Sequence, residues 1–273
     1  MIRFFDTLLT LRASSDLPQK LERLNHFAAV LADSPAVGFD RETPVMPLGA
    51  PSYATICKIV HGSEVPRRRN LGTDEGRIIF LHALTHIEYS AIDLALDSAY
   101  RFRDLPPQFY EDWLSVALDE ARHFAMLQQL LAELGSYYGA LPVHTGIHDA
   151  MVRSENSLRR RMVAAHRHLE ANGLDAHPEL ARKMSLFNDA MAAKIGSALR
   201  LIFDEEIGHV AAGDFWFRYA CALDGADANN FAPDVELAIP GTKIGGKKNL
   251  NFEARRRAGF TESDLATLAR LPD

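Results

Sequence analysis

The sequence predicts an all-α protein, and three observations support this. Between residues 73 and 223, apolar side chains recur at alternating spacings of three and four, which is the period of an amphipathic helix. The chain contains no series of segments in which apolar and polar residues alternate, as they would in half-buried strands. The breaks in the helical pattern are short and contain Gly or Pro, as between antiparallel helices. We therefore expect four long helices, at about 74–102, 107–134, 147–172 and 178–223, the last interrupted near 188–189.

The segments on either side of these helices differ in composition. An N-terminal helical segment is predicted for residues 1–32, interrupted near residues 14–16. Residues 33–72 contain five prolines and four glycines, which predict an extended arm because proline cannot continue a helix or a strand ladder. A loop-rich tail follows the bundle and ends in a short helix that Thr261 caps, with Asp264 three residues later. We therefore divide the chain into a helical segment and Pro/Gly-rich arm (1–72), a four-helix bundle (73–223) and a C-terminal extension packed on the bundle (224–273).

Composition argues against several classes of protein. The 273 residues carry 30 basic and 36 acidic side chains, a net charge of −6 that disfavours a dedicated nucleic-acid binder. The two cysteines, Cys57 and Cys221, provide neither a disulfide framework nor a zinc knuckle. No uncharged apolar run approaches the roughly 18 residues of a membrane span, and Asp6 and Arg12 interrupt any secretory signal. We expect a cytoplasmic protein with no membrane partner.

Acidic residues and histidines occupy inward positions of the predicted helices. Glu120 and His123 lie in mid-stripe in the second helix, between apolar residues such as Val116 and Leu127. Glu206 and His209 take the same places in the fourth helix. The first helix has a single Glu in its stripe, with the inward positions Leu81, Thr85, Glu88, Ile92, Ala95 and Ala99. Burying several carboxylates is costly unless they share a cation. Glu-x-x-His directs a carboxylate oxygen and an imidazole nitrogen towards the same point, and this combination of donors suits Fe(II) or Mn(II).

The third helix is expected to supply a fourth carboxylate, from Glu155 or Glu170. Its most apolar stripe, through Met162 and Ala165, runs beside Glu170 rather than through it. Spacing nevertheless favours Glu170, because Glu88 and Glu120 are 32 positions apart and Glu170 and Glu206 are 36 apart, whereas Glu155 would give 51. Four carboxylates would balance two divalent ions. Dimetal four-helix bundles use the same ligand set, with one Glu from each of two helices and Glu-x-x-His from each of the other two.

These residues resemble the ferritin-like di-iron carboxylate superfamily. The motifs are Glu88, Glu120-Ala-Arg-His123, Glu170 and Glu206-Ile-Gly-His209. More narrowly, the chain from about residue 45 to 270 resembles a bacterial family of ferritin-like proteins labelled as a domain of unknown function. That likeness is carried by Pro66-Arg-Arg-Arg, His82-Ala-Leu-Thr-His-Ile-Glu88, Phe109-Tyr-x-Asp-Trp113, Glu120-Ala-Arg-His-Phe124, Leu169-Glu-Ala-Asn-Gly-Leu-Asp175, Asp204-Glu-Glu-Ile-Gly-His209 and Asn251-Phe-Glu-Ala-Arg255. The resemblance implies a four-helix core with two metal ions and brings no substrate.

The leading hypothesis for function is an O2-activating oxidoreductase, a hydroxylase or oxidase of an unidentified substrate. Its cofactor would be two iron ions, or Mn/Fe or Mn/Mn, with O2 as co-substrate, and no catalytic residue is predicted beyond the ligands. The expected partners are a small-molecule substrate and an electron-donating reductase, and a homodimer is left open. The predicted metal ligands are Glu88, Glu120, His123, Glu170, Glu206 and His209.

The sequence leaves alternative functions open. The chain could be an iron-handling ferroxidase or storage protein, or a metal-stabilised binding protein without turnover. A tRNA-modifying hydroxylase is a minor alternative, for which a basic track would come from Arg67–Arg69, Arg159–Arg161, Lys243, Lys247 and Lys248. For His82 and His86 we favour polar packing over a place beside the metals. Trp113, Phe124, Phe215 and Trp216 are expected in the core.

Overall fold

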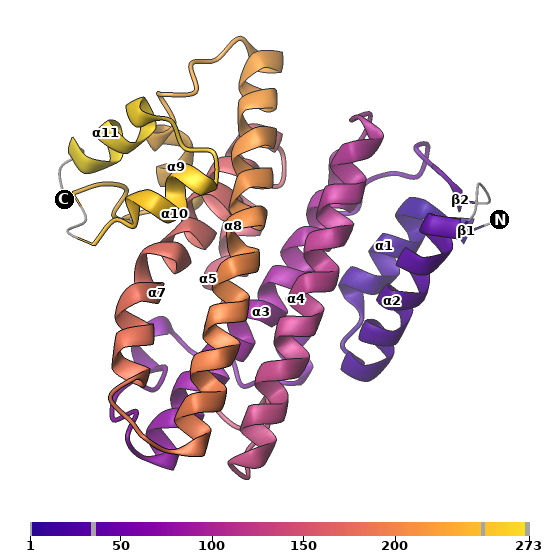
Figure 1. The fold of residues 1–273 in the computed structure, drawn as a ribbon. Helices are drawn as coiled ribbons and strands as arrows, with labels where there is room; N and C mark the ends of the chain where they lie inside the picture. The colour runs from indigo at the N-terminus through magenta and orange to yellow at the C-terminus, as the bar shows by residue number, and fades with distance from the viewer. Residues whose placement is uncertain (1, 34–36, 247–248, 271–273) are drawn as a thin grey trace. The chain divides into compact units, whose positions relative to one another are not determined.

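The computed structural model describes residues 2–33, 37–246 and 249–270, and these residues are predominantly helical (Figure 1). The prediction of an all-α protein is confirmed at this level. The only extended pairing in the described ranges is minor: strands β1 (Ile2–Arg3) and β2 (Val37–Gly38) pair in parallel, and Ile59 forms a bridge with Val143. The chain divides into two compact units, residues 1–148 and 149–273, and each is described by itself below.

The first unit is built on a pair of long helices, α3 (Asp74–Arg101) and α4 (Pro107–Glu133). Their bounds agree with the prediction to within a residue. Thr73 begins α3 because its side chain accepts a hydrogen bond from the Gly76 amide at 3.1 Å. Pro107 stands at the first position of α4, where its missing N–H costs nothing. The linker between the two helices is therefore short, and they pack along their length.

The N-terminal segment of this unit is helical with a break, as predicted. Helices α1 (Phe4–Ala13) and α2 (Leu17–Asp33) are separated at residues 14–16. In the arm that follows, β2 is succeeded by the short turns η1 (Ser52–Thr55) and η2 (Gly62–Glu64). Buried ion pairs attach the two N-terminal helices to α3. Lys20 of α2 binds Asp93, and Arg12 of α1 lies 2.5 Å from Asp97. Removing one partner of such a pair would leave a buried charge uncompensated.

The second unit departs from the prediction of one helix at 147–172. It has four successive elements there, α5 (Gly146–Arg153), α6 (Leu158–Arg161), the π-helix η3 (Met162–Glu170) and α7 (Ala171–Met184). A new helix, α6, begins after Ser157, whose side chain accepts a hydrogen bond from the Arg160 amide at 3.2 Å. The predicted stop at Gly173 is wrong, because α7 continues through Gly173 and Pro178.

A tertiary contact explains how α7 accommodates its proline. Pro178 has no N–H to donate to the carbonyl of Leu174, four residues earlier. The side chain of Asn251, from the C-terminal tail, donates to that carbonyl at 3.2 Å instead. Arg255 strengthens the same contact by binding Asp175 through two hydrogen bonds of 2.9 and 2.6 Å. Asn251 of the tail thus replaces the backbone hydrogen bond that α7 loses at Pro178.

Helix α8 (Ala190–Asp224) and the tail complete the second unit. The predicted interruption near 188–189 is confirmed as the start of α8, since Asp189 accepts from the Ala192 amide at 2.9 Å. The tail contains α9 (Ala232–Ala238), α10 (Phe252–Arg257) and α11 (Glu262–Arg270). The predicted cap of the last helix is confirmed, because Thr261 and Asp264 exchange backbone-to-side-chain bonds of 2.8 and 3.1 Å. Across the described ranges, we find no helix with the length and apolar character needed to cross a membrane.

Candidate metal centre

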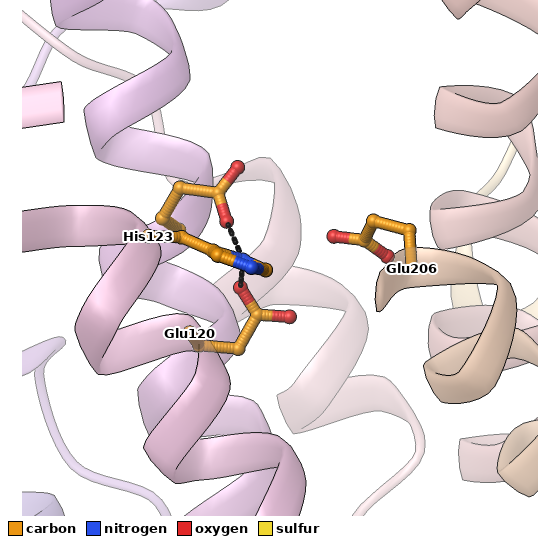
Figure 2. Close-up of side chains that lie close together, drawn as sticks. Glu120, His123 and Glu206 are labelled. Atoms are coloured by element: carbon orange, nitrogen blue, oxygen red, sulfur yellow. Dashed lines mark hydrogen bonds and ion pairs between the residues drawn. The ribbon is translucent and has the colours of Figure 1, made fainter. Parts of the chain in front are cut away.

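The first unit brings three of the predicted ligands together. Glu88 lies on α3, and Glu120 and His123 lie one turn apart on α4. The Nδ1 atom of His123 is 3.2 Å from Oε2 of Glu88 and 3.5 Å from Oε2 of Glu120. Figure 2 shows the His123 ring with the labelled Glu120 beside it. One ligand atom of each of the three residues lies within 4.8 Å of the others, as binding to a common ion requires.

This cluster is deeply buried. The exposed fraction is 3% for Glu88 and zero for Glu120 and His123. The helical stripe explains the placement, because the inward neighbours of these residues, such as Ile92, Val116 and Leu127, are buried as predicted. Apolar neighbours exclude water, which strengthens any charge interaction inside the cluster. They also make two adjacent carboxylates expensive to keep ionised without a cation.

The charges of the cluster fit a divalent ion. Burial works against protonation of His123, but hydrogen bonds and charge from Glu120 and Glu88 outweigh it and raise the pKa of His123 to about 11. A protonated imidazole supplies one positive charge against two carboxylates. A divalent cation would balance both carboxylates and would be ligated by the neutral ring. The donor set of two hard oxygens and one imidazole nitrogen suits Fe(II) or Mn(II).

The second unit contains the other three predicted ligands. On α8, Nδ1 of His209 lies 3.7 Å from Oε2 of Glu206, and the side chains are 4% and 15% exposed. Glu170 is the last residue of η3, with a side chain that is 10% exposed, and its Oε1 lies 2.9 Å from Nδ1 of His166. The alternative carboxylate, Glu155, lies in the turn between α5 and α6, outside any helical stripe. Of the two candidate carboxylates, Glu170 thus lies on a helix and Glu155 lies in a turn.

Comparison with known proteins places the chain in a family. A family model described as "Protein of unknown function (DUF455)" matches residues 13–266. The chain belongs to this family. A protein of Haemophilus influenzae named "Uncharacterized protein" is 36% identical over 214 residues, which cover 76% of this chain and 72% of the relative. No solved structure matches the chain.

The π-helix of this DUF455 protein explains why the apolar stripe of its third predicted helix does not pass through Glu170. A π-helix has a wider turn than an α-helix, so a count in steps of three and four falls out of register within it. Every residue from Met162 to His168 is buried, including His166 at zero exposure. His166 lies four positions before Glu170, so a regular helical count also places the two on one face. His166 is not among the predicted ligands, and the count does not indicate the π-helix. The mismatch between the apolar stripe and Glu170 is the signal that could have indicated it.

His82 and His86 pack through their ring nitrogens, as we favoured. Nε2 of His82 accepts from the backbone amides of Gly139 and Leu141 at 3.0 and 3.3 Å. Burial lowers the pKa of His82 to about 4, so the ring stays neutral. His86 bonds through Nδ1 to the Tyr138 hydroxyl and through Nε2 to the carbonyl of His144, each at 2.9 Å. Both rings therefore hold the segment after α4 against α3.

The basic runs differ in their surroundings. Arg159 lies 2.9 Å from Asp234, and the Arg161 guanidinium is fully buried, where it donates to the Ser154 hydroxyl at 2.8 Å. These arginines hold the second unit together and do not form an open basic track. Arg67–Arg69 are exposed in the arm. Lys243 is also exposed, whereas Lys247 and Lys248 lie outside the described residues.

One aromatic prediction is wrong. Phe215, predicted in the core, is 58% exposed, because it lies one position away from the inward residue Trp216 and therefore on another side of α8. Trp216, Trp113 and Phe124 are buried as predicted.

Proposed function

We propose that this DUF455 protein is a dimetal carboxylate protein with a ferritin-like four-helix core. The observation that carries the proposal is the buried cluster of Glu88, Glu120 and His123, which has the charge, donor types and close spacing that a divalent ion requires. The four helices would be α3, α4, the η3–α7 segment and α8. The second unit supports the proposal because it repeats the arrangement of one lone Glu and one Glu-x-x-His.

The proposed ligands lie on helices of both units. Glu88, Glu120 and His123 would come from the first unit, and Glu170, Glu206 and His209 from the second. Four carboxylates would then neutralise two divalent ions, which we propose to be two irons, with Mn/Fe and Mn/Mn as alternatives. Two ferrous ions in such a site supply the electrons for hydroxylation or oxidation of a small molecule with O2, and a partner reductase would restore them.

The chain's own residues would orient and shield this site. Carboxylates can bind one or two ions and can change between these modes, which leaves room for a ligand from outside the protein. The histidines bind as neutral bases, so acid should compete with metal for them. Tyr89 and Phe124 follow Glu88 and His123 in the sequence and pack edge to face with their rings 5.7 Å apart. The burial of Glu88, Glu120 and His123 would keep water away from these ligands.

Metal analysis tests the proposal directly. Wild-type protein should contain about two transition-metal ions per chain, and Glu120→Gln and Glu206→Gln should each lose most of this content while keeping their helical circular dichroism. Glu111→Ala, at an exposed position on the same helix as Glu120, is the matched control and should bind as wild type does. Equal metal content in all four proteins would contradict the proposal.

Reaction with O2 distinguishes the proposed activity from iron handling. Fe(II)-loaded protein exposed to O2 should consume O2 faster when a suitable small molecule and reductant are present. A storage protein would instead accumulate ferric iron beyond the two-ion stoichiometry, as part of a multi-subunit shell that size-exclusion chromatography would detect. A metal-stabilised binding protein would do neither.

A further inference from the structure

His166 is a buried histidine that lies beside a proposed ligand and is not part of the Glu-x-x-His motifs. It belongs to the π-helix η3, its side chain has zero exposure, and its Nδ1 is 2.9 Å from Oε1 of Glu170. The first unit has no counterpart, since the residue four positions before Glu88 is Leu84. The two proposed sets of ligands therefore differ in whether a histidine lies one turn before the lone Glu.

Close packing fixes the backbone at His166 on one side. A Cβ atom built on Gly213 of α8 would lie 2.5 Å from Cβ of His166 and 3.1 Å from its carbonyl carbon. Only glycine at position 213 therefore allows η3 to approach α8 this closely. Gly213 is also one turn after His209 on the same side of α8, so His166 is held against the surface that carries the second Glu-x-x-His.

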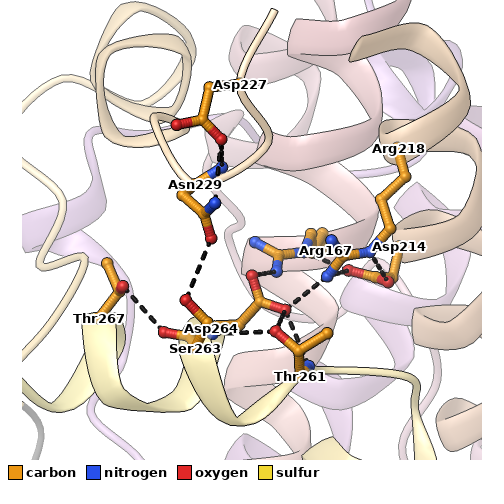
Figure 3. Close-up of polar contacts among 9 residues, drawn as sticks. All are labelled: Arg167, Asp214, Arg218, Asp227, Asn229, Thr261, Ser263, Asp264 and Thr267. Carbon is orange, nitrogen blue, oxygen red and sulfur yellow. Dashed lines mark hydrogen bonds and ion pairs between the residues drawn. The ribbon is translucent and has the colours of Figure 1, made fainter. Parts of the chain in front are cut away.

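Ion pairs hold the next residue, Arg167, in place. Arg167 binds Asp214 at 2.5 Å and Asp264 at 2.7 Å, and Arg218 joins the same two carboxylates (Figure 3). The Arg167 guanidinium also lies over the ring of Phe260, 4.4 Å from its centre. Contacts with α8 and α11 therefore hold both His166 and Arg167, which restricts where the imidazole can lie.

We infer that His166 is a positioning residue for Glu170: its Nδ1–H donates to Oε1 and so directs Oε2 towards the metal. The inference rests on the proposed function. The chemistry supports it because a carboxylate ligand commonly has one oxygen held by a hydrogen bond, and loss of such a bond weakens metal binding by about 10- to 100-fold. His166 is not itself counted as a ligand.

Three substitutions separate hydrogen bonding from packing. The side-chain nitrogen of Asn occupies nearly the place of Nδ1 in His, so His166→Asn keeps a donor to Glu170, whereas His166→Gln displaces the donor and His166→Leu removes it. His168→Leu is the matched control, because His168 is buried on the same π-helix and contacts Thr242 at 3.3 Å rather than a proposed ligand.

Titration of the ion-free proteins with Co(II), followed by its visible absorption, gives both the number and the affinity of the sites. Wild type and His168→Leu should bind two ions with similar affinity. His166→Leu and His166→Gln should keep one site and lose about 10- to 100-fold in affinity at the other, with a changed spectrum, and His166→Asn should restore most of the loss. Thermal unfolding of the metal-free proteins is the control for packing. In that measurement, His166→Asn should be no closer to wild type than His166→Leu and His166→Gln are.

The outcomes separate this inference from the function it rests on. If wild type binds no Co(II) beyond the level of Glu120→Gln, the proposed function itself fails. If wild type binds two ions and Glu120→Gln does not, but all three His166 variants match wild type, the inference is overturned. It is also overturned if His166→Asn loses as much affinity as His166→Leu, because His166 would then act only through its shape.

Discussion

The two units carry the same motif on different helices. In the first unit, Glu88 and Glu120 lie on regular α-helices, and the residue four positions after His123 is Leu127, a fully buried packing residue. In the second unit the lone Glu lies on a π-helix, and the residue four positions after His209 is Gly213. The comparison teaches that the lone Glu of the proposed ligand set can lie on either of two kinds of helical backbone. The irregular one needs support from distant residues.

That support has a clear physical origin. Regular helices satisfy their own backbone hydrogen bonds except at their ends. The backbones of α3 and α4 in the first unit therefore need little support beyond their end caps. The π-helix and the proline-containing α7 leave backbone groups or space that other segments must fill. In the C-terminal tail, Asn251 and Arg255 donate to the carbonyls of Leu174 and Ala171, and Asp264 binds the guanidinium of Arg167. We therefore expect substitutions that disturb this support to reveal the difference between the units.

The largest effect is expected at Gly213. Gly213→Ala places a methyl group where backbone and Cβ atoms of the π-helix lie, and the second unit must shift to admit it. Overpacking of this kind costs about 1–3 kcal/mol of unfolding free energy, measurable by urea denaturation. Gly196→Ala on the same helix is the control, because its Cβ would meet only the Arg200 side chain at 3.7 Å, and it should be neutral or slightly stabilising. Equal effects at the two glycines would remove the argument for close packing at His166.

A smaller effect is expected at Asn251. Asn251→Ala removes the bond to the Leu174 carbonyl and the cap of α10, where Asn251 accepts from the Ala254 amide at 3.1 Å, and should cost about 1–2 kcal/mol. Restoring the backbone donor with Pro178→Ala should make the same substitution less costly. A double-mutant cycle in urea measures this coupling. Additive effects would show that the tail does not compensate for the proline.

At neutral pH the smallest effect is expected in the first unit, because the contribution of His82 to stability changes only as the pH falls. His82 is neutral when folded because burial lowers its pKa to about 4 from 6.5, so the unfolded chain takes up a proton first as the pH falls. Its contribution to the free energy of unfolding should be constant above about pH 7 and should decline between about pH 6.5 and 4. His82→Gln should make the decline shallower in pH-dependent urea denaturation, whereas the exposed His26→Gln should not. The same slope in both variants would contradict the proposed neutral, accepting state of His82.

Local patterns determined much of this protein by themselves. The period of the apolar residues and the caps at Thr73, Asp189 and Thr261 are local, so α3, α4, the start of α8 and the last helix were predictable. The same period indicated that Glu88, Glu120 and His123 face inward, and the structure brings these three together. A helix of regular geometry converts sequence spacing into a shared face without help from elsewhere.

Only the tertiary structure decided the rest. The π-turn at Met162–Glu170, the passage of α7 through Pro178 and the burial of Arg161 depend on partners that lie far away in the sequence, such as Asn251 for Pro178 and Gly213 for His166. The three features share one physical reason. A strained backbone or a buried polar group is stable only when a distant residue forms its missing hydrogen bond or leaves space for it. Sequence periodicity carries no record of such partners, and that is why only the folded chain shows the packing of His166 against Gly213.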